Sequence, residues 1–139
     1  MTRSQPLRRT GRQRTRYADA ATIDAYRWAH ERCAACHRPH WHPDVWSLDV
    51  HHLFGGRLCR PDAAWGVLLL CRRYDQPGCH WRLDHSRENL AVCLTMKAEL
   101  GEYEPAACQA WLDRFGEILP EPAELPAWVL NLRNNWSER

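Results

Sequence analysis

Two pairs of cysteines constrain this chain more than any other feature of its sequence. Cys33 and Cys36 form a Cys-x-x-Cys turn, and Cys71 and Cys79 form a second pair separated by seven residues. Two thiolates from a tight turn bind one side of a tetrahedral ion, and a second pair completes a site with no position left for water. The pattern predicts a closed, structural Zn²⁺ site that supplies folding free energy to a small core.

Other cysteines and two histidines of the chain could in principle replace one of these four zinc ligands. The spacing of the second pair exceeds the usual two to four residues, so Cys59, His37 and His80 remain substitute ligands. Cys93 and Cys108 lie at apolar helical positions, where a free cysteine behaves as a small buried hydrophobe. The cysteines number seven, which is odd, and the N-terminal residues do not resemble a secretory signal. Metal ligation and a cytoplasmic location are therefore expected rather than a disulfide framework.

The positive charge is concentrated at the N-terminus. The 139 residues include 19 basic and 17 acidic ones, but residues 1 to 16 hold six arginines and no acid, which leaves 13 basic and 17 acidic residues elsewhere, a net charge of −4. We interpret residues 1 to 16 as a disordered basic arm that neutralises DNA phosphates. The alternative is a tail that only keeps the protein soluble. The arginines expected to contact DNA include Arg8, Arg9, Arg12, Arg14 and Arg16.

Apolar periodicity predicts a mixed α+β chain with no membrane partner, since no apolar run approaches the roughly 20 residues of a membrane span. Residues 18 to 32 have near-helical spacing, with Asp19 or Thr22 as the N-cap. Residues 45 to 54 alternate as a strand, and residues 65 to 71 fit a second, buried strand. Further helices are expected at residues 79–84, 86–100, 105–119 and 127–136. The resulting division is an arm at 1–16, a core at 17–100 and a C-terminal helical extension packing on the core at 101–139.

Histidines stand at the ends of these predicted elements. Asp49, His51 and His52 end the first strand, two glycines follow, and Cys79 and His80 open a helix. Over about residues 30 to 90 this order of parts resembles the HNH endonuclease family, the ββα-metal nucleases. Zinc-bearing members of that family also have a Cys-x-x-Cys knuckle ahead of the first histidines. The basic arm is similar to that of small HNH proteins encoded by phages and prophages.

The resemblance implies a small ββα-metal core held by a four-cysteine zinc knuckle and flanked by helices. It implies that His52 is the general base, and that His51 and His80 bind one catalytic divalent metal, which is Mg²⁺, Mn²⁺ or Zn²⁺. Asp49 is then a further ligand or a partner that fixes the tautomer of His51. Strand alternation supports this division of roles, because His51 and His52 face opposite ways.

Two neighbouring residues are candidates for the third ligand of the catalytic metal. On a helix that begins at His80, Asp84 lies one turn further on, whereas His85 points about 140° away. The family favours an imidazole at this point. We expect His85 first, because the chain should break before an N-cap at Ser86, and we keep Asp84 as its rival.

One position departs from the family pattern. Counting back from Cys71, Gly66 stands where HNH enzymes have the middle Asn that orients the base. A glycine has no side chain and adds backbone freedom, so the sequence predicts a loosely held His52 and a slow nuclease. Gly66→Asn is then expected to raise the turnover.

Three functions follow from these features. The first is a metal-dependent DNA endonuclease that hydrolyses phosphodiester bonds, with phage packaging machinery as a candidate protein partner. The second is a zinc-stabilised DNA-binding module of the same fold that is catalytically weak or inactive. The third is a structural zinc protein that docks another protein through the tryptophan-rich C-terminus, which contains Trp111, Trp128 and Trp136.

Overall fold

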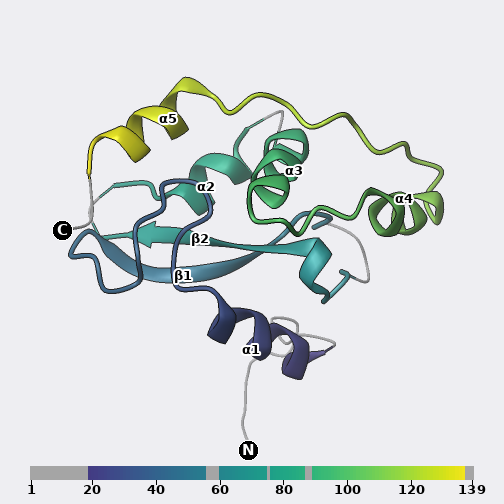
Figure 1. Ribbon diagram of the computed structural model, residues 1–139, viewed down its shortest axis with the longest axis horizontal. Coiled ribbons are helices and arrows are strands. Elements are labelled where there is room, and N and C mark those ends of the chain that lie inside the picture. Colours follow the sequence, from purple (N-terminus) through teal and green to yellow (C-terminus); the bar gives the residue numbers. More distant parts are fainter. Residues whose placement is uncertain (1–18, 56–59, 75, 87–88, 137–139) are drawn as a thin grey trace, which may run out of the picture.

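The computed structural model describes residues 19–55, 60–74, 76–86 and 89–136 (Figure 1). The basic arm at residues 1 to 16 and Cys59 lie outside the described residues. Within them, the chain has five α-helices and one two-stranded sheet, so the predicted α+β class is confirmed. The elements are α1 (Ala20–Ala29), β1 (Val45–His52), the 3-10 turn η2 (Ala64–Gly66), β2 (Val67–Arg73), α2 (Cys79–Asp84), α3 (Asn89–Glu99), α4 (Pro105–Asp113) and α5 (Ala127–Asn134).

The two strands form an antiparallel pair in which His51 lies opposite Leu68 and His52 opposite Val67. Every residue of β2 from Val67 to Cys71 is buried. This burial accounts for the continuous apolar run in the sequence, because a strand covered on both faces does not alternate. The register shifts between Val45 and Ser47, which marks an irregularity at the start of β1.

Helices cover both sides of this hairpin (Figure 1). α1 lies on one side, whereas α2, α3 and α5 lie on the other. The core between them is formed by Ile23 and Tyr26 of α1, the apolar side chains of β2, and Val92, Leu94 and Met96 of α3. None of the helices in the described segments is long and apolar enough to cross a membrane.

Two helices, α1 and α4, end three or more residues earlier than the sequence predicted. Asp19 caps α1 by accepting a hydrogen bond from the backbone N–H of Thr22, but the helix ends at Ala29, since His30 is already extended. α4 ends at Asp113, where the expected helix continued to residue 119. Gly116 adopts a φ of 68°, and the following N–H of Glu117 bonds back to Leu112 O. A left-handed glycine of this kind closes a helix, and periodicity alone did not reveal it.

Candidate metal centres

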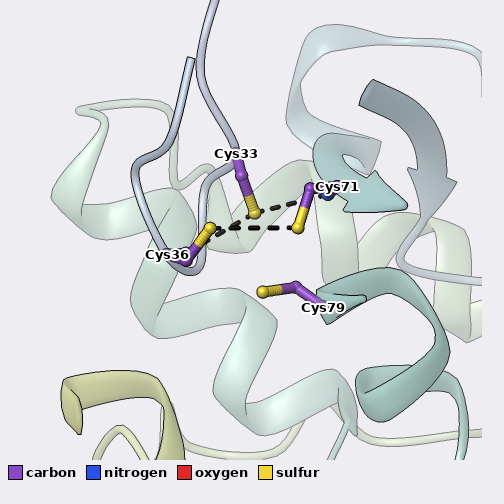
Figure 2. Close-up of side chains that lie close together, drawn as sticks. All are labelled: Cys33, Cys36, Cys71 and Cys79. Carbon is purple, nitrogen blue, oxygen red and sulfur yellow. Dashed lines mark hydrogen bonds between the residues drawn. The ribbon is translucent and has the colours of Figure 1, made fainter. Parts of the chain in front are cut away.

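The four predicted zinc ligands meet at one point beneath the hairpin (Figure 2). Cys33 and Cys36 come from the turn after α1, Cys71 from β2, and Cys79 from the first residue of α2. All four are buried, and their sulfur atoms all lie within 4.8 Å of one another. The two pairs therefore form one cluster that could hold a metal ion.

The spacing of the sulfur atoms fits a tetrahedral zinc ion. Sulfurs bound at about 2.3 Å in a tetrahedron lie about 3.8 Å apart. The sulfurs of Cys36 and Cys71 are 3.8 Å apart. The backbone N–H groups of Cys36 and Cys71 donate to the sulfur of Cys33 at 3.5 and 3.4 Å. The distances and the donor set fit a structural zinc ion.

Gly78 explains how the second pair closes despite its long spacing. A side-chain carbon at this position would collide with the carbonyl oxygen of Cys71 and lie 2.9 Å from the Cα of Arg72. The loop between the two cysteines therefore returns directly onto the end of β2. Only a residue without a Cβ permits this approach, and it brings Cys79 back to Cys71.

The pKa values of two of the thiols shift in opposite directions. Burial raises the pKa of Cys33 well above its ordinary value. The pKa of Cys36 is lowered, mainly by a hydrogen bond with Cys33. Several buried thiolates side by side repel one another and lack the stabilisation that water gives an ion. A divalent cation among them stabilises the fully ionised set, which is the form that binds zinc.

The C-terminal helix closes the cysteine turn from outside. Arg133 donates from Nε to the carbonyl oxygen of Ala35 at 2.6 Å and from Nη2 to that of Ala34 at 3.1 Å. Trp136 donates from Nε1 to the carbonyl of Cys36 at 3.0 Å. The turn therefore has its outward carbonyl groups satisfied by α5 and the residues just after it.

A second group of candidate ligands comprises His51, His80 and Asp84. One ligand atom from each lies within 4.8 Å of the others. His51 Nδ1 is 3.4 Å from Asp84 Oδ1, and His80 Nε2 is 3.5 Å from Asp84 Oδ2. His51 is buried, His80 is half-buried and Asp84 is exposed. Three protein ligands with an open side are the arrangement that leaves room for water or substrate on a metal.

Two further side chains hold the imidazoles of this group. Asp49 Oδ2 is 3.3 Å from His80 Nδ1, so Asp49 contacts His80 rather than acting on His51. Asn89, the first residue of α3, places Oδ1 3.3 Å from His51 Nε2. Sequence reasoning missed Asn89, because nothing in the local pattern links the start of α3 to the end of β1.

The environment sets opposite protonation tendencies for the two histidines. Burial lowers the pKa of His51 to about 4, so this imidazole is neutral near pH 7 and available as a ligand. The hydrogen bond with Asp49 raises the pKa of His80, and the same bond lowers the pKa of Asp49 to about 2. A negative Asp49 is thus available to orient the ring of His80.

His85, the third ligand that the sequence analysis placed first, lies apart from this group. Its ring stacks on Trp81 with centroids 4.0 Å apart, and its Nδ1 is 2.8 Å from the carbonyl oxygen of Trp81. α2 continues as a helix to Asp84, and His85 is its C-cap. Helical geometry therefore brings Asp84, and not His85, onto the face that carries His80.

His52 points away from the ligand group and contacts Asp62. Its Nε2 is 2.8 Å from Asp62 Oδ1, and both side chains are 4% exposed. Burial lowers the pKa of His52. Asp62 Oδ2 also accepts the backbone N–H of Asp19 at 2.9 Å, so one carboxylate connects the end of β1 to the start of α1. Sequence reasoning missed Asp62, which lies in a stretch that reads as a polar spacer.

Gly66 ties the same region together through its backbone. Its carbonyl oxygen accepts the N–H of Leu53 at 2.9 Å, directly after His52. A Cβ at this position would lie 3.1 Å from the carbonyl oxygen of Pro61, closer than side-chain carbons usually approach an oxygen. At Gly66, where the sequence resemblance expected an Asn, the chain makes a close backbone approach, and Asp62 contacts the imidazole of His52.

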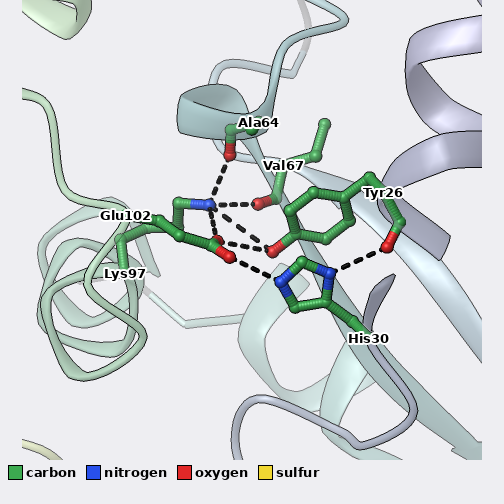
Figure 3. Close-up of polar contacts among 6 residues, drawn as sticks. All are labelled: Tyr26, His30, Ala64, Val67, Lys97 and Glu102. Atoms are coloured by element: carbon green, nitrogen blue, oxygen red, sulfur yellow. Dashed lines mark hydrogen bonds and ion pairs between the residues drawn. The ribbon is translucent and has the colours of Figure 1, made fainter. Parts of the chain in front are cut away.

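A buried lysine anchors the segment that carries Asp62 and Gly66 (Figure 3). Lys97 of α3 is fully buried, and its Nζ donates to the carbonyl oxygens of Ala64 and Val67, the latter at 2.9 Å. Glu102 pairs with Lys97 at 2.6 Å. Tyr26 of α1 and His30, the residue just after that helix, complete the network, with distances of 2.8 and 2.5 Å to the oxygens of Glu102. Burial lowers the pKa of Lys97.

The remaining predicted residues take structural positions. Cys93 and Cys108 are fully buried in the core and belong to neither ligand group, although the Cys93 thiol donates to Asn89 Oδ1 at 3.2 Å, beside His51. Trp111 and Trp128 are half-buried against the core. Trp136 is also half-buried and donates to the cysteine turn. His37 and His80, the described substitute ligands, are not part of the cysteine cluster.

Comparison with known proteins gives no assignment: no family model matches the chain, and neither a curated protein nor a solved structure matches it significantly.

Proposed function

We propose that this protein is a metal-dependent DNA endonuclease with a ββα-metal core, in which a structural zinc and a reacting centre lie side by side. The proposal rests on one observation: two separate groups of candidate metal ligands each take a residue from the start of α2. Cys79 belongs to a closed group of four cysteines, and the next residue, His80, belongs to an open group with His51 and Asp84. Closed thiolate sites are structural, whereas three-ligand sites with an open side are typical of catalysis.

The residues of the open group fit a divalent cation. Imidazole nitrogens from His51 and His80 and a carboxylate from Asp84 form a mixed nitrogen and oxygen set, which favours Mn²⁺ or Zn²⁺ over Mg²⁺. Such an ion, when bound, polarises a phosphate and stabilises the leaving 3′ oxygen. Asp49 orients His80, and Arg72, whose Nη2 lies 3.0 Å from Asp49 Oδ2, adds a positive charge for the phosphate backbone.

The experiment is incubation of supercoiled plasmid with the protein, with and without Mg²⁺, Mn²⁺ or Zn²⁺. Relaxed or linear DNA is expected only with metal. His80→Ala should lose this activity, and His40→Ala, which changes an exposed histidine outside both ligand groups, should keep it. Cleavage that survives His80→Ala, or no cleavage with any of the three metals, would contradict the proposal.

A DNA-binding module without catalysis is the second candidate, and the environment of His52 favours it. A general base must reach the attacking water, but the side chain of His52 is 4% exposed and its Nε2 contacts Asp62. If the protein is an enzyme that uses this base, His52→Ala should abolish cleavage and leave DNA affinity nearly unchanged. Retarded plasmid without any metal-dependent product would favour the binding module.

A further inference from the structure

Three exposed aromatic side chains lie near the open ligand group. Trp46 and Tyr74, at one end of the hairpin, are 60% and 67% exposed, and Trp81 of α2 is 54% exposed. Large aromatic side chains are usually buried at least in part, since each offers a large apolar surface. Three of them exposed near one site therefore require a reason.

A continuous set of contacts joins the ligand group to the first two aromatics. His80 contacts Asp49, and Asp49 Oδ2 accepts a hydrogen bond from Arg72 Nε at 3.0 Å. The guanidinium of Arg72 lies 5.8 Å from the ring centroid of Trp46. The rings of Trp46 and Tyr74 are nearly parallel, with an interplanar angle of 17° and centroids 6.1 Å apart. A cation and two stacked rings thus extend from the site along the hairpin.

Trp81 lies on the other side of the same site. It follows His80 in α2, and both line a hollow of about 340 Å³ together with Arg72 and Asp84. This volume lies at the lower end of the roughly 300 to 1,000 Å³ typical of small-ligand sites. The hollow therefore has candidate metal ligands in its wall, an aromatic ring on one side and a guanidinium on another.

We propose that Trp46, Tyr74 and Trp81 are stacking platforms for unpaired bases, so that this site takes single-stranded nucleic acid. Bases in a duplex already stack on one another and present only their edges, whereas the faces of unpaired bases are free to stack on aromatic rings. Arg72, which lies near the ring of Trp46 and lines the hollow with Trp81, contributes a charge for the nucleic-acid backbone. The inference rests on the proposed function only in taking His51, His80 and Asp84 as the reacting centre.

Binding without added divalent metal tests this inference separately from cleavage. A dye-labelled oligothymidylate, the matching oligouridylate and a DNA duplex of equal length are titrated with the full chain, and fluorescence anisotropy gives each Kd. Tighter binding of either single strand than of the duplex is expected. Trp46→Ala and Trp81→Ala should each weaken single-strand binding roughly 5- to 150-fold, the range that loss of one base stack gives.

The matched control is Trp28→Ala. Trp28 is 87% exposed on α1, across the hairpin from α2, so its loss should change the Kd less than twofold. Trp81→Phe keeps an aromatic face and should retain most of the affinity. Equal binding of duplex and single strands, or platform variants that bind like the wild type, would overturn the inference even if plasmid is cleaved. Single-strand binding through the platforms would support it even if plasmid stays intact.

Discussion

Cys79 and His80 are adjacent in the first turn of α2, yet their side chains enter two different ligand groups. Cys79 completes the buried cysteine cluster, and His80 lies with His51 and Asp84. α2 has six residues, so it is too short to be stable as an isolated helix. The position of His80 therefore depends on the anchor that Cys79 provides.

This dependence gives the first prediction. The wild-type chain purified without added metal should contain about one zinc, and Cys79→Ser should lower the zinc content and the Tm together. The same variant should weaken Mn²⁺ binding at the open group, because His80 loses its support. Cys108→Ser is the control, since Cys108 is equally buried but outside the cluster. Elemental analysis and calorimetric titration are the measurements, and full zinc in Cys79→Ser would rule out the four-thiolate site.

Substitutions at Asp84 and His85 test which of the two is the third ligand beside His51 and His80. Asp84→Ala should weaken Mn²⁺ binding at the open group at least tenfold, a loss of about 1.4 kcal/mol, because Asp84 contacts both His51 and His80. His85→Ala should leave the Mn²⁺ affinity nearly unchanged, since its ring stacks on Trp81. Titration of each zinc-loaded variant with Mn²⁺ measures the difference, and the reverse order would restore His85 as the ligand.

The network around Lys97 should make the free energy of unfolding depend on pH in the acidic range. Although burial opposes it, hydrogen bonds from Lys97, His30 and Tyr26 lower the pKa of Glu102 below its ordinary value of 4.5. A carboxyl group with a lowered pKa in the folded state contributes stability above pH 4.5 and loses it as the pH falls through the folded-state pKa. The free energy of unfolding should therefore decline below pH 4.5.

Glu102→Gln should flatten this decline and cost about 2 kcal/mol at pH 7, because it leaves the fully buried ammonium of Lys97 without its counter-charge. Urea unfolding at pH values from 3 to 7 measures both effects. Glu124→Gln, an exposed carboxyl group outside the network, should follow the wild-type curve. An unchanged acid dependence in Glu102→Gln would show that other carboxyl groups cause it.

Removal of residues 1 to 16 should weaken DNA binding and reduce its dependence on salt, while the zinc content stays the same. The six arginines of this arm would release counterions from phosphates, and their loss should lower the slope of log K against log salt by up to about 5. Affinity measured at several salt concentrations gives the slope. An unchanged slope would mean that the arm does not contact DNA.

The sequence predicted those features that depend on local pattern. Cysteine spacing and strand alternation indicated the cluster and the hairpin, because each cysteine pair and each strand has a recognisable local pattern. Asp62, Asn89 and the partners of Lys97 were not predicted, since these contacts join residues 30 or more positions apart or fall in a loop without periodicity. Lys97 is the only lysine of the chain. Its burial on α3 is explained only by the partners that the fold brings to its ammonium group.

Gly66 gives the last prediction, and here the structure changes the expectation from the sequence. The missing Asn suggested a loosely held base and a gain of turnover in Gly66→Asn. His52 is instead held by the buried carboxylate of Asp62, and the backbone of Gly66 already bonds to Leu53. The φ of Gly66 is not in the left-handed region, but its Cβ would lie 3.1 Å from the carbonyl oxygen of Pro61.

Gly66→Asn should therefore lower the Tm without speeding any cleavage, because the added side chain must displace Pro61 and has no free imidazole to orient. Asp62→Asn should have the larger effect on rate: misplacing a catalytic group by about 1 Å can cost on the order of 100-fold. Plasmid cleavage rates and thermal unfolding of both variants separate the two contributions. Faster cleavage by Gly66→Asn with an unchanged Tm would mean that His52 is not held by Asp62 during the reaction, and that an Asn at this position can orient it.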